Sequence, residues 1–313
     1  MPKNGYIVVE ALYKMPDEPI KEDNERYASI DIGVNNLAAV YSNVADALLI
    51  SGKPLKAINQ YYNKEVSKCQ SLLAENNNKV TNDVTRKEQK QHASHATRFL
   101  AMKRNNKISD YLHKASSQIV QYLVSNEINT LIVGNNKGWK QSNRMRHGSK
   151  EMQSFQSIPF SSFISMLQYK CALAGIRVIL QEESYTSKAS AFDGDYIPKF
   201  DKNMPKEERV KQTTFSGKRV KRGLYKTKNG ILVNADINGA ANVLRKYLQE
   251  VCDANKIDAR KASEPADIGY VMNPLQVRVL FQEIKCGSKT RTRQKNAKRQ
   301  NTCEKNQKQT VKS

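Results

Sequence analysis

Short runs of apolar residues, separated by glycine, asparagine and charged residues, occupy most of the first fifty positions. The segment GYIVVEALYK (5–14) alternates apolar and polar residues and predicts a strand. YASIDIGVNNLAAVYS (27–42) predicts two strands around a turn, with the first strand ending near Asp31. DALLISG (46–52) predicts a third strand. After a polar linker at PDEPIKEDNE, the pattern therefore indicates an antiparallel meander.

A long helical stretch and a strand–helix–strand unit follow the meander. From Pro54 to Asn126, apolar residues recur at close to a helical period. TLIVGNN (130–136) and RVILQEES (177–184) each predict a short buried strand. Between them, FQSIPFSSFISMLQYKCALAGI (155–176) predicts an amphipathic helix with Gly175 at its end. Two strands joined by a helix predict a parallel crossover, so the sheet should be mixed.

The last third of the chain changes character twice. Residues 188–230 are polar and rich in Lys, Asp and Gly, which favours a loop-rich lid inserted into the domain. GILVNAD then leads into a helix at NGAANVLRKYLQEV (238–251), and GYVMNPLQVRVLF (269–281) predicts a final strand that returns to the body. From Lys285 onward ten Lys or Arg stand against one acid, Glu304, which predicts a disordered basic arm.

This order of elements is typical of an α/β domain with a ribonuclease-H-like fold. Such a fold has a mixed sheet with flanking helices, here extended by a helical insertion and a polar lid subdomain. In it, we expect Asp31 at the middle of the central strand, a glutamate at a neighbouring strand end and an aspartate at the last helix. The three carboxylates can then meet at one point.

The net charge of the chain indicates which class of molecule it binds. The formal net charge is +22, from 52 Lys and Arg against 30 Asp and Glu. A surface this basic attracts polyanions, and nucleic acid is the usual one. No apolar stretch approaches the roughly 18 residues of a spanning helix, and the N-terminus lacks the organisation of a signal peptide, so we predict a cytosolic protein without a membrane partner. The five cysteines are scattered without a CxxC pair, and we expect neither disulfides nor zinc.

Three segments carry carboxylates in the setting that a metal-dependent nuclease needs. Asp31 follows an apolar run, Glu182 and Glu183 end another, and Asp236 opens a helix. Acids from separate elements can hold two divalent ions, Mg²⁺ or Mn²⁺, against a phosphodiester. Each acid also has a simpler explanation: Asp31 can cap a turn, Asp236 can cap its helix, and the glutamates can be solvated. Their coincidence in a very basic chain favours catalysis.

Several blocks of the chain resemble the TnpB family, the OrfB-type proteins of bacterial insertion sequences, which are related to type V CRISPR effectors. The blocks are SIDIGVNNLAAV, TLIVGNNKGWKQ, the stretch from FQSIPF to YTSKAS, KRGLYKTKNGILVNADINGAANVLRK and GYVMNPLQVRV. They occur in order between about residues 5 and 280. The resemblance implies a RuvC-like domain that cleaves a DNA target under the direction of a guide RNA, with base pairing reading the sequence.

The resemblance also implies roles for the acids. Asp31 matches the first RuvC aspartate and Asp236 the third catalytic acid. In many relatives a glutamate ends the strand that corresponds to TLIVGNN, but Gly134 stands there. The second acid is then supplied by the segment after the next strand, with Glu183 preferred over Glu182. Strand alternation points these two to opposite faces. The metal ligands expected are Asp31, Glu183 and Asp236.

Two departures from the family pattern bear on domains and partners. Many relatives carry a four-cysteine zinc ribbon where this chain has the lid, which holds no cysteine. Full-length relatives also have a recognition half before the nuclease, so we expect a truncated copy or a partner protein that supplies this half. The predicted division is 1–26 residual recognition strand and linker, 27–187 nuclease core with helical insertion, 188–230 lid, 231–284 closing segment, and 285–313 basic tail.

Contacts to nucleic acid are predicted from charge and position. The candidates are Arg222 and Lys221 before the third acid, Lys137, Trp139 and Lys140 after a strand end, and Arg104, Lys107 and His113 in the helical insertion. Trp139 can stack on a base or cover the core. Two further functions stay open: a catalytically inactive nucleic-acid-binding remnant, and a conventional transposase that joins strands.

Overall fold

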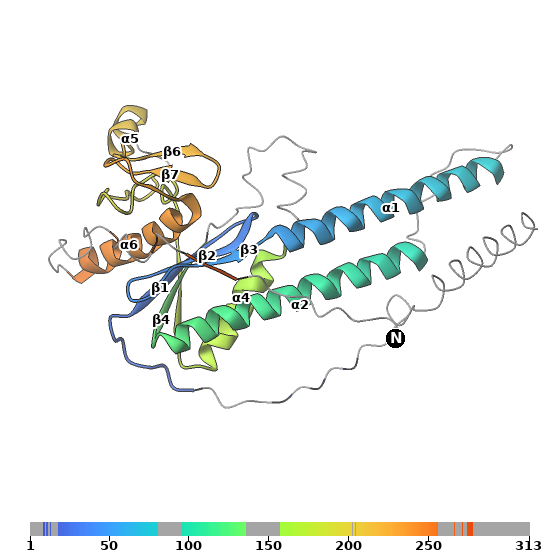
Figure 1. Cartoon of the computed structure of the whole chain (residues 1–313), viewed down its shortest axis with the longest axis horizontal. Coiled ribbons are helices and arrows are strands. Elements are labelled where there is room, and N and C mark those ends of the chain that lie inside the picture. Colours follow the sequence, from blue (N-terminus) through green and yellow to red (C-terminus); the bar gives the residue numbers. More distant parts are fainter. Residues whose placement is uncertain are drawn as a thin grey trace, which may run out of the picture. The chain divides into compact units, whose positions relative to one another are not determined.

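The chain folds as a mixed sheet with helices around it (Figure 1). The computed structural model describes residues 9, 11, 13, 18–80, 95–135, 157–201, 203, 205–255, 266, 271 and 274–277, and all of them fall in one compact unit. Most of the predicted strand at 5–14, the candidates Lys137, Trp139 and Lys140, and the basic tail lie outside the described residues.

The predicted meander is confirmed. Strands β1 (Tyr27–Ile32), β2 (Asn36–Ser42) and β3 (Leu48–Ser51) pair antiparallel in sequence order. The turn between β1 and β2 is short and consists of Gly33, Val34 and Asn35, so β2 returns directly along β1. Asp31 is the fifth of the six residues of β1, and it therefore lies near the end of that strand rather than at its middle.

The parallel crossover is also confirmed. Strand β4 (Thr130–Gly134) pairs parallel with β1, helix α4 (Phe160–Ala172) follows, and β5 (Arg177–Gln181) pairs parallel with β4. Gly175 has φ +68° just after α4, a conformation that glycine adopts without strain. The prediction of a buried β5 was wrong, because this strand lies at the sheet edge with only Gln181 buried.

The strand order identifies the fold. The sheet runs β5-β4-β1-β2-β3-β9, where β9 (Leu275–Val277) pairs parallel with β3. Within this sheet, β2 alone runs against the other strands. A meander extended by parallel strands on the side of β1 is the arrangement of a ribonuclease-H-like fold, as the sequence predicted.

Alternation along β1 assigns its two faces. Tyr27 packs its ring against Tyr247 of helix α6 (Ala235–Asn255), and Ser29 donates a hydrogen bond of 2.6 Å to the Ala240 carbonyl of the same helix. Odd positions of β1 therefore face α6, and Asp31 shares that face. The even positions are buried toward the other side of the sheet, where Figure 1 shows α2 (His95–Ser125) and α4.

Two long helices form the predicted helical insertion. Helix α1 (Lys53–Val80) leaves β3 directly and packs against α2, which in turn packs against α4. The buried positions of α2 recur at helical spacing, at Ile108, Leu112, Ala115 and Ile119. None of the described helices is long and apolar enough to cross a bilayer.

The lid is more regular than predicted. It holds helix α5 (Lys206–Gln212) and strands β6 (Lys218–Lys221) and β7 (Leu224–Lys226), which form an antiparallel sheet with β8 (Leu232–Asn234). The other described residues between 188 and 230 lie outside helices and strands, which agrees with a loop-rich segment.

Acidic side chains tie the lid together. The Asp195 carboxylate accepts hydrogen bonds from the Ser190 amide (2.8 Å) and the Ser216 hydroxyl (2.7 Å), and Asp193 accepts one from the Lys228 amide (2.8 Å). These bonds join the start of the lid to β6 and to the β7–β8 turn. A carboxylate can bridge several backbone segments in this way because it accepts from more than one donor.

Candidate active site

The Asp31 carboxylate lies against the first turns of α6. A Cβ atom built on Gly239 would stand 2.4 Å from Asp31 Oδ2, which is far inside contact distance. Helix α6 can therefore pack on β1 at this point only because residue 239 has no side chain. The close approach places the carboxylate beside the amino-terminal end of the helix, where Asp236 also lies.

Asp236 does not cap its own helix. The cap is Asn234, whose side-chain oxygen accepts hydrogen bonds from the amides of Asp236 (2.9 Å) and Ile237 (3.3 Å). The Asp236 carboxylate instead accepts a hydrogen bond of 2.8 Å from the Asn36 amide side chain and faces the Arg219 guanidinium at 3.7 Å. The capping explanation for this acid is thus excluded, and its carboxylate is directed toward the start of β2.

Glu183 reaches the end of the neighbouring strand. Gly134, the last residue of β4, pairs with Gln181, two residues before Glu183. A Cβ atom on Gly134 would stand 1.9 Å from Glu183 Oε1, so the carboxylate occupies the space that a side chain at 134 would fill. The Glu183 carboxylate therefore lies where a side chain at the end of β4 would lie.

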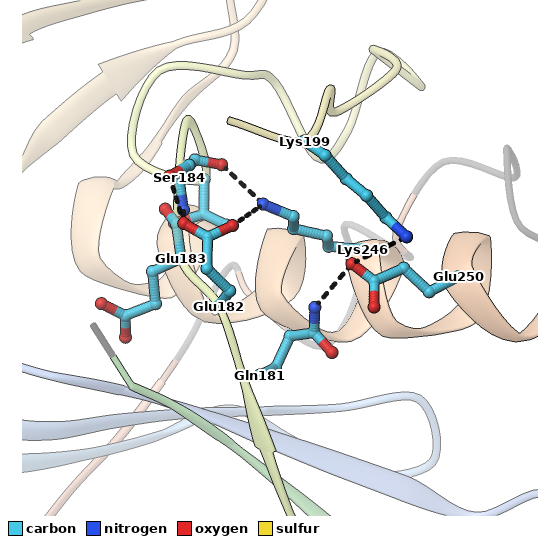
Figure 2. Close-up of polar contacts among 8 residues, drawn as sticks. Gln181, Glu182, Glu183, Ser184, Lys199, Lys246 and Glu250 are labelled. Atoms are coloured by element: carbon cyan, nitrogen blue, oxygen red, sulfur yellow. Dashed lines mark hydrogen bonds and ion pairs between the residues drawn. The ribbon is translucent and has the colours of Figure 1, made fainter. Parts of the chain in front are cut away.

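Glu182 points away from that position (Figure 2). Its carboxylate forms an ion pair of 2.5 Å with Lys246 of α6 and accepts a hydrogen bond of 2.7 Å from the Ser184 amide. Burial opposes ionisation, but the hydrogen bonds from Lys246 and Ser184 hold the pKa of Glu182 below its ordinary value. The two adjacent glutamates therefore have different surroundings, although both lie beyond the end of β5, where strand alternation does not apply.

The carboxylate of Asp31 repels those of Asp236 and Glu183. Burial and the charge of Asp236 raise the pKa of Asp31 to about 7, although Arg219 opposes the shift. Burial, then Asp31 and Glu182, raise the pKa of Glu183 to about 9, against the opposing charge of Lys246. Such mutual repulsion is a property of sites that gather carboxylates for a cation or a proton.

The donors of this cluster are of the kind that hard divalent cations such as Mg²⁺ or Mn²⁺ prefer, because all of them are carboxylate oxygens. Among the residues that the structure describes, no three His, Cys, Asp or Glu side chains surround one point closely enough to hold an ion. The charge of Asp236 acts on Asp31, and the charge of Asp31 acts on Glu183. A bound divalent cation would relieve this repulsion.

Basic residues of the lid border the same place. A cleft of about 370 Å³ lies between the loop after β5 and strand β6, and Lys188, Lys218 and Arg219 contribute to its lining. Lys221 and Arg222, at the β6–β7 turn, are exposed. Positive side chains beside a carboxylate cluster can bind the backbone of a nucleic acid without competing for the cation sites.

The candidates in the helical insertion differ among themselves. Lys107 and His113 are exposed on α2. The Arg104 guanidinium is held within the protein, because it donates to Asn59 (2.7 Å) and to the Ser157 carbonyl (2.7 Å) and lies over the Tyr62 ring. Arg104 thus joins α1, α2 and the start of α4, and a role in binding nucleic acid stays a prediction for this residue.

Two site residues were missed at the level of sequence. Asn36 orients Asp236, and Lys246 pairs with Glu182 while only 1% of its side chain is exposed. Lys246 follows Asn238 and Asn242 at four-residue intervals on a buried side of α6, where Arg245 and Gln249 are buried as well. Polar residues repeated at helical spacing on a buried face were the signal that could have revealed it.

Comparison with known families agrees with the fold. A family model described as a probable transposase, OrfB_IS605, matches residues 10–140, and one described as Cas12f1-like, TNB domain, matches residues 160–243. No match was found among curated proteins.

Solved structures with similar folds include three RNA-guided systems. The first is a Cas12f1–sgRNA–target DNA complex, with 17% identity and a TM-score of 0.44 over 71% of this chain and 50% of that chain. The second is the mini-RNA-guided endonuclease CRISPR-Cas_phi3, with 14% identity and a TM-score of 0.35 over 70% of this chain and 44% of that chain. The third is Alicyclobacillus acidoterrestris C2c1 with single-guide RNA, with 15% identity and a TM-score of 0.35 over 62% of this chain and 20% of that chain. The chain spans half or less of the length of each. The two family models match in order along the chain, which is similar to OrfB-type transposases over residues 10–140 and to the Cas12f1-like TNB domain over residues 160–243.

Proposed function

We propose that the chain is a metal-dependent DNA endonuclease of the RNA-guided, transposon-encoded type. The observation that carries this proposal is the approach of Glu183 and Asp236 to Asp31, from three separate elements, at places where Gly134 and Gly239 leave room for the carboxylates. Structural acids are seldom gathered at a cost in repulsion unless a ligand relieves it.

Each residue has a defined task in this proposal. Asp31 would bind both ions, Glu183 one of them and Asp236 the other, while Asn36 holds the Asp236 carboxylate in orientation. A bound pair of divalent ions lowers the pKa of an attacking water and stabilises the leaving oxygen of a phosphodiester. The exposed bases at the β6–β7 turn, including Arg222, would hold the DNA backbone.

The partners belong to the same proposal. The net charge of +22 suits nucleic acid, and we propose a DNA target and a guide RNA as the two ligands. Base pairing to the guide would then read the sequence, while the protein contacts backbone. A recognition half encoded separately stays a prediction, as does a cytosolic location in a bacterial cell.

The test is cleavage of labelled DNA by the purified chain with Mg²⁺ or Mn²⁺, with and without guide RNA. The matched variants are Asp31→Asn and Asp236→Asn, which keep side-chain shape and remove the charge. Metal-dependent cutting that both variants abolish supports the proposal. Salt-sensitive binding without cutting by the parent chain, with both metals and a guide present, would favour the inactive binding remnant. Joined strands as the product would favour a conventional transposase.

A further inference from the structure

One side of α6 carries a buried series of polar residues, one helical turn apart. Asn238, Asn242 and Lys246 are each at most 1% exposed, and Glu250 continues the series. Together they bind the segment 181–191, which carries Glu183, in antiparallel order. Asn238 bonds to Ala191 and Ala189, Asn242 to Ala189 and Thr186, Lys246 to Ser184 and Glu182, and Glu250 to Gln181.

Lys246 is the member of this series nearest to Glu183. Its ammonium donates to Glu182 Oε2 at 2.5 Å and to the Ser184 carbonyl at 3.1 Å. Lys246 therefore forms hydrogen bonds with the residue before Glu183 and with the residue after it, as Figure 2 shows. The Ser184 hydroxyl and amide both donate to the same Glu182 carboxylate, which closes a compact loop around this point.

The contacts of Lys246 affect the carboxylates of Glu182 and Glu183 differently. Lys246 holds the Glu182 carboxylate at α6, whereas the carboxylate of Glu183, the next residue, lies in the space at Gly134. Without the ammonium group of Lys246, the Glu182 carboxylate would lose its charged partner and keep only the hydrogen bonds from Ser184, and about half of its side chain is already exposed. It could then compete with Glu183 for the position beside Asp31.

We propose that Lys246 is a positioning residue that acts through Glu182 to present Glu183, and not its neighbour, to the metal ions. This inference rests on the proposed function, since it assigns the device that orients one of the proposed ligands. Lys246 itself touches neither substrate nor the proposed ions. Residues that orient metal ligands in this indirect way alter metal affinity or activity by about 10- to 100-fold when they are changed.

A double-mutant cycle on Mn²⁺ affinity tests this assignment in the full chain. The variants are Lys246→Met, Glu182→Gln and the two together, with Lys246→Arg as the conservative substitution. Lys199→Met is the matched control, because Lys199 also pairs with an acid of α6, Glu250 at 3.8 Å, but is 68% exposed. Mn²⁺ binding is measured by electron paramagnetic resonance, and hydrogen exchange reports the amides of residues 182–186.

The expected pattern separates positioning from simple stability. Lys246→Met should weaken Mn²⁺ binding at least about 10-fold and speed exchange at the Ser184 amide, whereas Lys246→Arg should retain most of the affinity. In the Glu182→Gln background, Lys246→Met should weaken Mn²⁺ binding by less than about threefold, because the competing carboxylate is gone. Lys199→Met should change neither quantity.

Three results would overturn the inference. Unchanged Mn²⁺ affinity in Lys246→Met, with only a lower melting temperature, would make Lys246 a structural residue. If Lys246→Met lowered Mn²⁺ affinity equally in the presence and absence of the Glu182 carboxylate, Lys246 would not act through that carboxylate. If the wild-type chain binds Mn²⁺ no better than Asp31→Asn does, the proposed metal site does not exist. The proposed function and this inference would then both be wrong.

Discussion

Replacing Glu183 with glutamine should stabilise the metal-free protein, although it removes a proposed metal ligand. The ordinary pKa of a glutamate lies near 4.5, and burial together with the charges of Asp31 and Glu182 raises that of Glu183 to about 9. At pH 7 the unfolded chain therefore releases a proton that the folded chain retains. Folding must work against this difference at every pH above 4.5.

The magnitude follows from the pKa difference. Between pH 4.5 and pH 7 the linkage amounts to roughly 3 kcal/mol at about 1.4 kcal/mol per pH unit. Glu183 is only partly buried by surface area, and contact with water reduces the figure, so we expect about 2 kcal/mol. Because the folded-state pKa is raised, the protein is most stable below pH 4.5 with respect to this group and loses stability as the pH rises toward 9.

Urea denaturation in EDTA at pH 5 and pH 8 measures the effect. The wild-type chain should lose stability over this longer interval, and Glu183→Gln should lose about 3 kcal/mol less. Added Mn²⁺ should stabilise the wild type at pH 8 and leave Glu183→Gln nearly unchanged. Glu182→Gln is a control of opposite sign, because the pKa of Glu182 is lowered in the folded state and its removal should destabilise the protein above pH 5. Equal pH slopes for wild type and Glu183→Gln would refute the reasoning.

Three further changes probe the room for the carboxylate, the lid and the basic turn. Gly134→Ala should displace Glu183 and weaken Mn²⁺ binding, measured by titration, by about 10-fold or more, while chemical denaturation shows little loss of stability. Asp195→Ala should loosen the lid at a cost of about 1–3 kcal/mol, seen as faster hydrogen exchange at the Ser216 amide, and unchanged exchange there would contradict the cross-link. Lys221→Ala with Arg222→Ala should reduce the salt dependence of DNA binding by a slope of about two, measured by fluorescence anisotropy in a salt series.

The elements of the core could be predicted because each has a local cause. Apolar runs bounded by turn residues give β1 to β4, and helical periodicity gives α2. The exposure of β5 could not be predicted, because a short apolar run has the same sequence pattern whether its strand lies at the edge or in the middle of a sheet. The strands of the lid were missed since each is only three or four residues long and mostly polar on its exposed side.

The site was predictable in part for a similar reason. Asp31 and Asp236 lie on the strand and the helix on which the sequence placed them, whereas Glu182 and Glu183 lie beyond β5, where strand alternation does not separate them. What sequence could not supply was the partner of each side chain. Lys246 lies 64 residues from Glu182 along the chain, and only the packing of α6 against the segment after β5 brings the two together.

Glu183, the proposed second acid, illustrates how a fold constrains a site without fixing which residue builds it. Because β4 and β5 are parallel neighbours with Gly134 opposite Gln181, the chain just beyond β5 passes the end of β4. An acid placed there can reach the same point, provided that residue 134 has no side chain. A loop is less rigid than a strand end, so an acid moved onto it needs external support. The polar side of α6 supplies that support, and Gly134, Glu183 and Lys246 therefore form one interdependent arrangement in which changing any member alone should cost the site its geometry.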